Sequence, residues 1–336
     1  MDTIIQILAR ELGRSEAHVE NVVRLIDEGN TIPFIARYRK ELHGSMDDQL
    51  LRRLADRLQY LRGLAARKEE VRAAVEGQGK LTEDLSAALD AAATLAEVED
   101  LYRPYKQKRR TRATVAREKG LEPLAELLFA QAADGPAPEE AAGAFIDPEK
   151  GVETAEDALQ GASDIIAERI SDDADIRKRL RELVWKKGYL VSAAAAKEPE
   201  DTVYRLYYAF RSPLNRVQGH QVLAVNRGER EGVLKVSVEM EREAALIPVR
   251  RAVLNPGAPA MAFVRAAAED AYDRLIFPSL EREVRNQLTE QADEGAIGQF
   301  ALNLKPLLMQ PPVKGRVTMG LDPGYRMGCK VAVVDP

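Results

Sequence analysis

Apolar residues recur at helical spacing through most of the chain, up to about Met309. The first such run ends at Gly13, and Ser15 is placed to cap a second helix that stops before Gly29. Pro33 then opens a short third helix, where its missing N–H is not needed. Two short helices joined by a glycine turn are compatible with a helix-turn-helix, although most such hairpins only support a fold. The pattern predicts a helical N-terminal region with a helix-turn-helix-like unit.

A long amphipathic run extends from Met46 to about Glu76. Its apolar residues are three or four positions apart and are flanked by charges, which favours one long packing helix within a bundle. Further helices are predicted after Thr82 and after Ser171, since both residues are placed as N-caps before apolar stripes. Helical spacing returns over residues 266–309.

Strand patterns are few. Residues 233–240 (VLKVSVEM) alternate apolar and polar side chains with the period of a strand. The preceding residues 220–232 are compatible with a strand or with a helix that starts at Ser212 and Pro213, and we favour the helix. Two strand-like runs enclose a tight turn within residues 317–336. The predicted fold is therefore mainly α, an elongated multi-helix assembly with a minor β element.

Composition excludes several classes of protein. The single cysteine, Cys329, rules out an internal disulfide and a multi-cysteine zinc site, and it fits a reducing cytoplasm. The three histidines are far apart in the sequence, and the acids between Asp164 and Asp175 lack the spacing of a calcium loop. No apolar run is long enough for a membrane helix, and the N-terminus lacks the pattern of a secretory signal. We therefore predict a cytoplasmic protein without a metal, a cofactor or a membrane partner.

Positive charge is concentrated in residues 101–120, LYRPYKQKRRTRATVAREKG. The whole chain has a formal net charge of −5, whereas this segment holds eight basic residues and one acid, Glu118. Such a cluster attracts phosphate whatever the base sequence, and Tyr102 and Tyr105 add surfaces on which bases could stack. We predict nucleic-acid contacts from its basic residues, which are Arg103, Lys106, Lys108, Arg109, Arg110, Arg112, Arg117 and Lys119.

Two other interpretations of this segment remain open. Its balance of +7 leaves a net −12 on the rest of the chain, so its cations could pair with acids of the same chain or of a partner protein. The segment could also be a targeting signal. A weaker second candidate lies in TIPFIARYRKEL, where Arg37, Arg39 and Lys40 either contact nucleic acid or form a solvated helix face.

Several long motifs occur in the order found in one known family. They are NTIPFIARYRKE, VEDLYRPYKQKRRTRA, AREKGLEPLA, EDALQGASDIIAERISD, LAVNRGEREGVLKV, PSLEREVRNQLTEQADEGAI and MGLDPGYRMGCKVAVVD. In these motifs, which span nearly the whole chain, the sequence resembles the bacterial Tex family of transcription accessory proteins. That family is similar in architecture to a eukaryotic elongation factor that travels with RNA polymerase.

The resemblance implies a domain order. Residues 1–200 would form a helical N-terminal region, 201–309 a helical core with the small β element, 310–316 a linker, and 317–336 the incomplete start of a YqgF-like domain of RNase H-like fold. The chain would then be an N-terminal portion without the family's helix-hairpin-helix elements and C-terminal RNA-binding OB-fold. Asp322 would hold the place of the first metal-binding carboxylate of such a nuclease. Because its partner acids would lie beyond the chain's last residue, no enzymatic activity is expected.

Three functions follow from these observations. The first is a non-enzymatic nucleic-acid-associated scaffold that contacts phosphates of RNA or DNA with little base preference. The second is a protein docking scaffold for RNA polymerase or ribosome-associated complexes, in which only the missing C-terminal domains bind nucleic acid. The third and weakest is a part of a metal-dependent nuclease.

Overall fold

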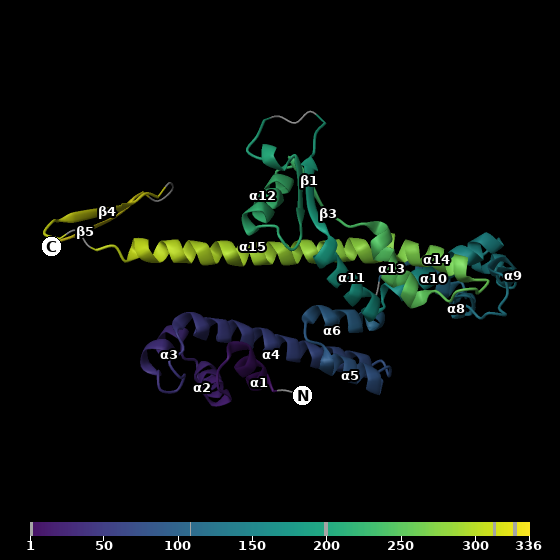
Figure 1. The fold of residues 1–336 in the computed structure, drawn as a ribbon, viewed down its shortest axis with the longest axis horizontal. Coiled ribbons are helices and arrows are strands. Elements are labelled where there is room, and N and C mark those ends of the chain that lie inside the picture. The colour runs from purple at the N-terminus through teal and green to yellow at the C-terminus, as the bar shows by residue number, and fades with distance from the viewer. Residues whose placement is uncertain (1–2, 108, 198–200, 312–313, 325–327) are drawn as a thin grey trace. The chain divides into compact units, whose positions relative to one another are not determined.

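The computed structural model describes residues 3–107, 109–197, 201–311, 314–324 and 328–336. The protein is mainly helical, with small antiparallel β elements in its C-terminal half, which confirms the predicted fold class (Figure 1). Internal contacts divide the chain into two units, residues 1–182 with 242–278, and residues 183–241 with 279–336. The domain boundaries expected at residues 200, 309 and 316 remain predictions.

The first unit is built from helices. In chain order they are α1 (Ile4–Leu12), α2 (Glu16–Asp27), α3 (Ile32–Tyr38), α4 (Asp48–Glu76), α5 (Glu83–Ala91), α6 (Leu95–Tyr102), η1 (Arg103–Tyr105), α7 (Arg112–Glu118), α8 (Glu122–Ala130), α9 (Pro138–Gly143), η2 (Pro148–Lys150), α10 (Ala155–Ser171), the first part of α11 (Ala174–Lys187), α13 (Arg242–Val253), α14 (Met261–Asp270) and the π-helical turn η4 (Ala271–Ile276). The predicted caps at Ser15 and Thr82 are confirmed, since each side chain accepts a hydrogen bond from the first turn of its helix. The long helix predicted from Met46 to Glu76 is confirmed as α4.

Two clusters of buried apolar side chains hold α1 to α6 together. The first joins α1, α2 and α3 to the N-terminal half of α4, with Leu8, Val22, Ile35 and Leu54 fully buried. The second packs the C-terminal half of α4 against α5 and α6. Because each short helix has too few residues to be stable alone, this shared burial is what keeps them folded.

The loop between α3 and α4 depends on a glycine. Gly44 has a left-handed φ of 58°, and a Cβ atom added there would overlap the imidazole ring of His18 on α2. We expect Gly44→Ala to lower the free energy of unfolding of the first unit by about 2–3 kcal/mol, through backbone strain and overpacking. Urea unfolding followed by circular dichroism measures the change. Gly79→Ala is the matched control, because φ there is 68° but a Cβ would meet open space; a Gly44 effect no larger than the control's would contradict the account.

Helix α10 lies at the centre of the remaining part of this unit, where α7, α8, α9 and α14 pack on it. Gly161 lets α7 approach closely, since a Cβ there would press on Leu121 and Ala116. The cap predicted at Ser171 is wrong. Helix α10 continues through Ser171, whose hydroxyl donates to the Glu168 carbonyl, and Asp173 caps α11 by accepting from the Ile176 N–H at 2.8 Å.

The second unit combines two helices with two small sheets. Its elements are the end of α11, β1 (Tyr189–Ala194), η3 (Arg205–Tyr207), β2 (Ala209–Pro213), α12 (Gly219–Arg230), β3 (Leu234–Glu239), α15 (Phe277–Leu308), β4 (Thr318–Asp322) and β5 (Lys330–Val334). The strand order is β2-β1-β3, all antiparallel, and α12 lies against one face of this sheet (Figure 1). Arg285 of α15 bonds to Glu229 of α12 and to the Val236 carbonyl of β3. The hydrogen bond from Arg285 also lowers the pKa of Glu229.

The sheet is larger than the sequence predicted. The strand expected at 233–240 is confirmed as β3, and the helix favoured for 220–232 is confirmed as α12. However, that helix does not start at Ser212 and Pro213, which end strand β2, and β1 was not foreseen. Buried Ser192 interrupts the apolar face of β1, where its hydroxyl donates to the Tyr207 carbonyl at 2.6 Å.

Strands β4 and β5 form an antiparallel pair within residues 317–336. Met319 lies opposite Val333 and Leu321 opposite Val331, so these four side chains share one face of the pair. All residues of both strands are exposed. The pair agrees with the expected strand content of an incomplete domain, whereas its RNase H-like nature remains a prediction.

Candidate nucleic-acid interface

The basic segment is carried by η1, by the loop after it and by α7. Pro104 lies in the first turn of η1, where its missing N–H is not needed. Thr111 then caps α7 by accepting a hydrogen bond from the Thr114 N–H at 3.0 Å. Ala113 and Ala116 are the buried residues of α7, so small apolar side chains anchor this helix.

Four of the predicted cations form ion pairs with acids of the same chain. The pairs, with their N–O distances, are Arg103–Asp172 (3.4 Å), Lys106–Glu99 (3.8 Å), Arg110–Glu118 (2.7 Å) and Arg117–Glu168 (2.7 Å). Their charges are therefore largely balanced before any partner arrives. This is the pairing with internal acids that the sequence left open, and it applies to only part of the segment.

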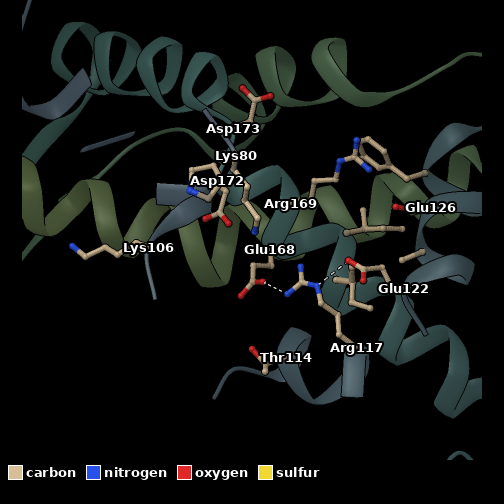
Figure 2. Close-up of a pocket in the computed structure, with 15 residues that line it drawn as sticks. Lys80, Lys106, Thr114, Arg117, Glu122, Glu126, Glu168, Arg169, Asp172 and Asp173 are labelled. Carbon is tan, nitrogen blue, oxygen red and sulfur yellow. Dashed lines mark hydrogen bonds and ion pairs between the residues drawn. The ribbon is translucent and has the colours of Figure 1, made fainter. Parts of the chain in front are cut away.

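The ion pairs of Arg117 and Arg103 are partly buried and join elements within the first unit. Burial is the largest single influence on Arg117 and opposes its charge, but the hydrogen bond to Glu168 and the negative charges of Glu168 and Glu122 together outweigh it and raise the pKa of Arg117. Figure 2 shows Arg117 between Glu168 and Glu122. Burial lowers the pKa of half-buried Arg103, and the positive charge of Arg177 acts in the same direction. Neither arginine offers a free charge to a ligand.

The other cations of the segment differ in what they contact. Lys119 donates to the Gly151 carbonyl at 2.7 Å. Arg109 and Arg112 are exposed, and within the described part of the chain neither takes part in an ion pair. Lys108 lies outside the described residues. Among the described members of the set, Arg109 and Arg112 are thus the exposed cations without an ion pair.

A cavity of about 630 Å³ lies beside the segment in the same unit (Figure 2). It is lined by four cations and five acids, which are Lys80, Lys106, Arg117 and Arg169, and Glu122, Glu126, Glu168, Asp172 and Asp173. The guanidinium of Arg169 stacks over the ring of Phe129, 4.5 Å from its centroid. Because its positive and negative charges nearly cancel, the cavity does not favour a polyanion.

The weaker candidate residues lie at the end of α3. Arg37 and Lys40 are exposed, and Arg39 is partly exposed. None of the three forms an ion pair with a carboxylate among the described residues. Arg39 donates instead to the Tyr38 carbonyl at 3.1 Å, and its guanidinium lies 5.2 Å from the centre of the Phe34 ring.

Acidic and sulfur side chains are not gathered for metal chemistry in the part of the chain that the structure describes. No group of three or more His, Cys, Asp or Glu residues there could hold a metal ion. Asp322 ends β4, where it is exposed and lies opposite Lys330. Among the described residues no helix is long and apolar enough to cross a bilayer.

Two family models match this chain. The model of the Tex-like protein N-terminal domain matches residues 2–76, and the Tex central region-like model matches residues 134–300. Together they cover well over half of the sequence. The chain belongs to the Tex family. The first model covers α1 to α4, and the second covers α10 and the three-stranded sheet.

Tex-family relatives align over almost the whole chain. The uncharacterized protein YdcI of Bacillus subtilis is 46% identical over 98% of this chain and 46% of its own length. The transcriptional accessory protein Tex of Neisseria gonorrhoeae is 40% identical over 99% of this chain and 44% of its own. The human S1 RNA-binding domain-containing protein 1 is 33% identical over 99% of this chain and 35% of its own. The chain therefore spans less than half the length of these relatives.

Sequence reasoning missed the acids that neutralise the basic segment of this Tex-family chain. Glu168 lies 51 residues from Arg117, and both of its oxygens are used, one by Arg117 and one by the Thr111 hydroxyl. Glu168 and Asp172 both lie in the motif EDALQGASDIIAERISD, which marked the family but assigned no role to either. No spacing rule links such distant residues, so only the packing of α7 on α10 identifies the pairs.

Proposed function

We propose that this Tex-family chain is a non-enzymatic, nucleic-acid-associated scaffold that contacts phosphates through its basic segment. The observation that carries the proposal is the exposure of Arg109 and Arg112 without ion pairs, in the most basic stretch of an acidic chain. Within the segment, these two arginines then supply the phosphate contacts, together with Lys108. In the sequence, Lys108 lies between Lys106 and Arg109. The names of relatives support a setting in transcription and RNA binding. The protein would act in the cytoplasm.

The geometry also accounts for the expected lack of base preference. Exposed guanidinium groups on a loop and a helix start reach phosphate oxygens, which are the same at every nucleotide. Reading of bases requires side chains inserted at base edges, whereas these contacts need only phosphate oxygens. Either RNA or DNA would satisfy the contacts.

The proposal predicts a salt-dependent affinity that two arginines control. For single-stranded RNA, replacing Arg109 and Arg112 by glutamine should reduce the slope of log K against log salt by about 1.4, since each phosphate contact contributes about 0.7. Fluorescence anisotropy with a labelled oligonucleotide measures this slope. The control, Arg265→Gln with Arg282→Gln, removes the same charge from two exposed arginines elsewhere. Equal slopes for the two double variants would refute the assignment, and no binding by the wild-type chain at low salt would refute the function.

One observation favours a second function, a protein docking scaffold. Four cations of the segment already hold acids, which shows that this surface accepts carboxylates. An acidic partner from the transcription or translation machinery could extend that pattern to Arg109 and Arg112. Binding of such a partner with nucleic acid absent, and its loss in the Arg109→Gln, Arg112→Gln variant, would favour docking over nucleic-acid contact.

A further inference from the structure

Aromatic rings and cations follow one another in the sequence at the end of helix α3. They are Phe34, Arg37, Tyr38, Arg39 and Lys40, called here the α3 cluster. The ring centroids of Phe34 and Tyr38 are 5.2 Å apart with the planes at 48°, and the Arg39 guanidinium lies over the Phe34 ring. Arg39 also bonds to the Tyr38 carbonyl. The Phe34 ring therefore packs against one side of the Tyr38 ring.

The free side of the α3 cluster faces solvent. The Tyr38 side chain is 60% exposed, which is a large exposed fraction for an aromatic residue on a short helix. Arg37 and Lys40 are also exposed, and the nearby acid Glu41 forms no ion pair with either within the described residues. Cations near a helix C-terminus stabilise the helix dipole, which explains the carbonyl bond of Arg39. It does not explain an exposed aromatic ring between two unpaired cations.

An exposed ring flanked by cations suits one class of ligand. Aromatic side chains stack on nucleobases, and arginine and lysine neutralise the neighbouring phosphates. In a duplex the faces of the bases are already stacked, so a surface ring can stack only on an unpaired base. We propose that the α3 cluster binds single-stranded nucleic acid, with a base stacked on Tyr38 and its flanking phosphates on Arg37 and Lys40. This rests on the proposed function only in that the chain meets nucleic acid, because the residues differ from those of the basic segment.

The test compares single-stranded and duplex ligands of the same sequence. The wild-type chain and its variants are titrated by anisotropy with a labelled RNA of roughly 12 nucleotides, a length within the usual range of single-strand sites. Tyr38→Ala should weaken binding to the single strand roughly tenfold and leave the duplex affinity unchanged. Tyr38→Phe should bind like the wild type, because the ring is kept. Quenching of 2-aminopurine in the same oligonucleotide reports stacking directly and should disappear in Tyr38→Ala.

The matched control is Phe300→Ala, which removes an aromatic ring that is 66% exposed on α15. It should change neither affinity. Equal losses for single strand and duplex in Tyr38→Ala, or an unchanged single-strand affinity, would overturn the inference. So would Tyr38-dependent binding of polyglutamate, since the cluster would then be a site for acidic proteins. If single-stranded RNA binds and only the Arg109→Gln, Arg112→Gln variant weakens it, the proposed function stands and the α3 inference fails; if nothing binds, both fail.

Discussion

Replacing Asp100 by leucine should lower the free energy of unfolding of the first unit by about 3–5 kcal/mol. The Asp100 carboxylate on α6 accepts from Arg177 and from Arg181 of α11, each at 2.6 Å. The side chains of Asp100 and Arg177 are 5% and 2% exposed. Removing the carboxylate would take away the counter-charge to which the buried Arg177 guanidinium donates, and breaking a buried ion pair from one side costs about 3–5 kcal/mol.

The measurement uses the only tryptophan of the chain. Trp185 lies on α11, the helix that carries both arginines, in the part of that helix that belongs to the second unit. Its fluorescence in urea is therefore recorded together with far-UV circular dichroism, which reports the loss of the helices of the first unit. Glu11→Gln is the control, because Glu11 pairs with Arg57 at a half-exposed surface site and such pairs contribute less than about 1 kcal/mol. The double variant Asp100→Leu, Arg177→Met should regain more than half of the loss, since well-packed apolar groups can replace a buried pair. A loss no larger than that of Glu11→Gln would contradict the electrostatic explanation.

Replacing Gln131 by alanine should have the second large effect, lowering the free energy of unfolding of the first unit by roughly 3 kcal/mol. Gln131 is 3% exposed. Its side chain donates to the Val253 carbonyl at 2.7 Å and accepts from the Asn255 N–H at 3.0 Å. The variant would leave two part-buried backbone groups without these partners, and an unsatisfied group of this kind costs about 1–3 kcal/mol. The two contacts join segments more than 120 residues apart, so their loss should loosen the end of α13 from the end of α8.

Thermal unfolding and amide hydrogen exchange of residues 250–256 would measure this loss. Gln131→Met has nearly the same volume as the native residue and should cost almost as much as alanine, because it also leaves the two groups unpaired. Gln299→Ala, at an exposed helical position, should have no measurable effect. Full stability of the methionine variant would assign the role of Gln131 to packing rather than to hydrogen bonds.

Local patterns predicted those elements whose stability is encoded in nearby residues. The caps at Ser15 and Thr82 and the long helix α4 follow from side chains within one or two turns. The cap at Ser171 failed because two residues compete within one short gap, and the carboxylate of Asp173 takes the role. Strands β1 and β2 were not predicted, because sheet formation depends on partners that are distant in sequence. Strand β1 pairs with β2 on one side and with β3 on the other.

The candidate interface shows the same limit more sharply. Composition located the concentration of positively charged residues within residues 101–120. It could not rank the cations, because Arg103, Arg110 and Arg117 look the same in sequence as Arg109 and Arg112. Their partners come from α7 itself and from α10, and only packing decides which guanidinium meets an acid.

By itself, the sequence determined the mainly helical fold class, the helix starts at Ser15 and Thr82, the long helix α4, the basic segment and the membership of the Tex family. These depend on local periodicity, on capping side chains and on motifs, all of which are read along the chain. The tertiary structure alone decided which charges are neutralised, that Gln131 and Asp100 connect distant segments, and that Tyr38 stands exposed between cations. The reason is physical: ion pairing and burial depend on distances in space, and residues that are 51 to 124 positions apart come together only when the helices pack.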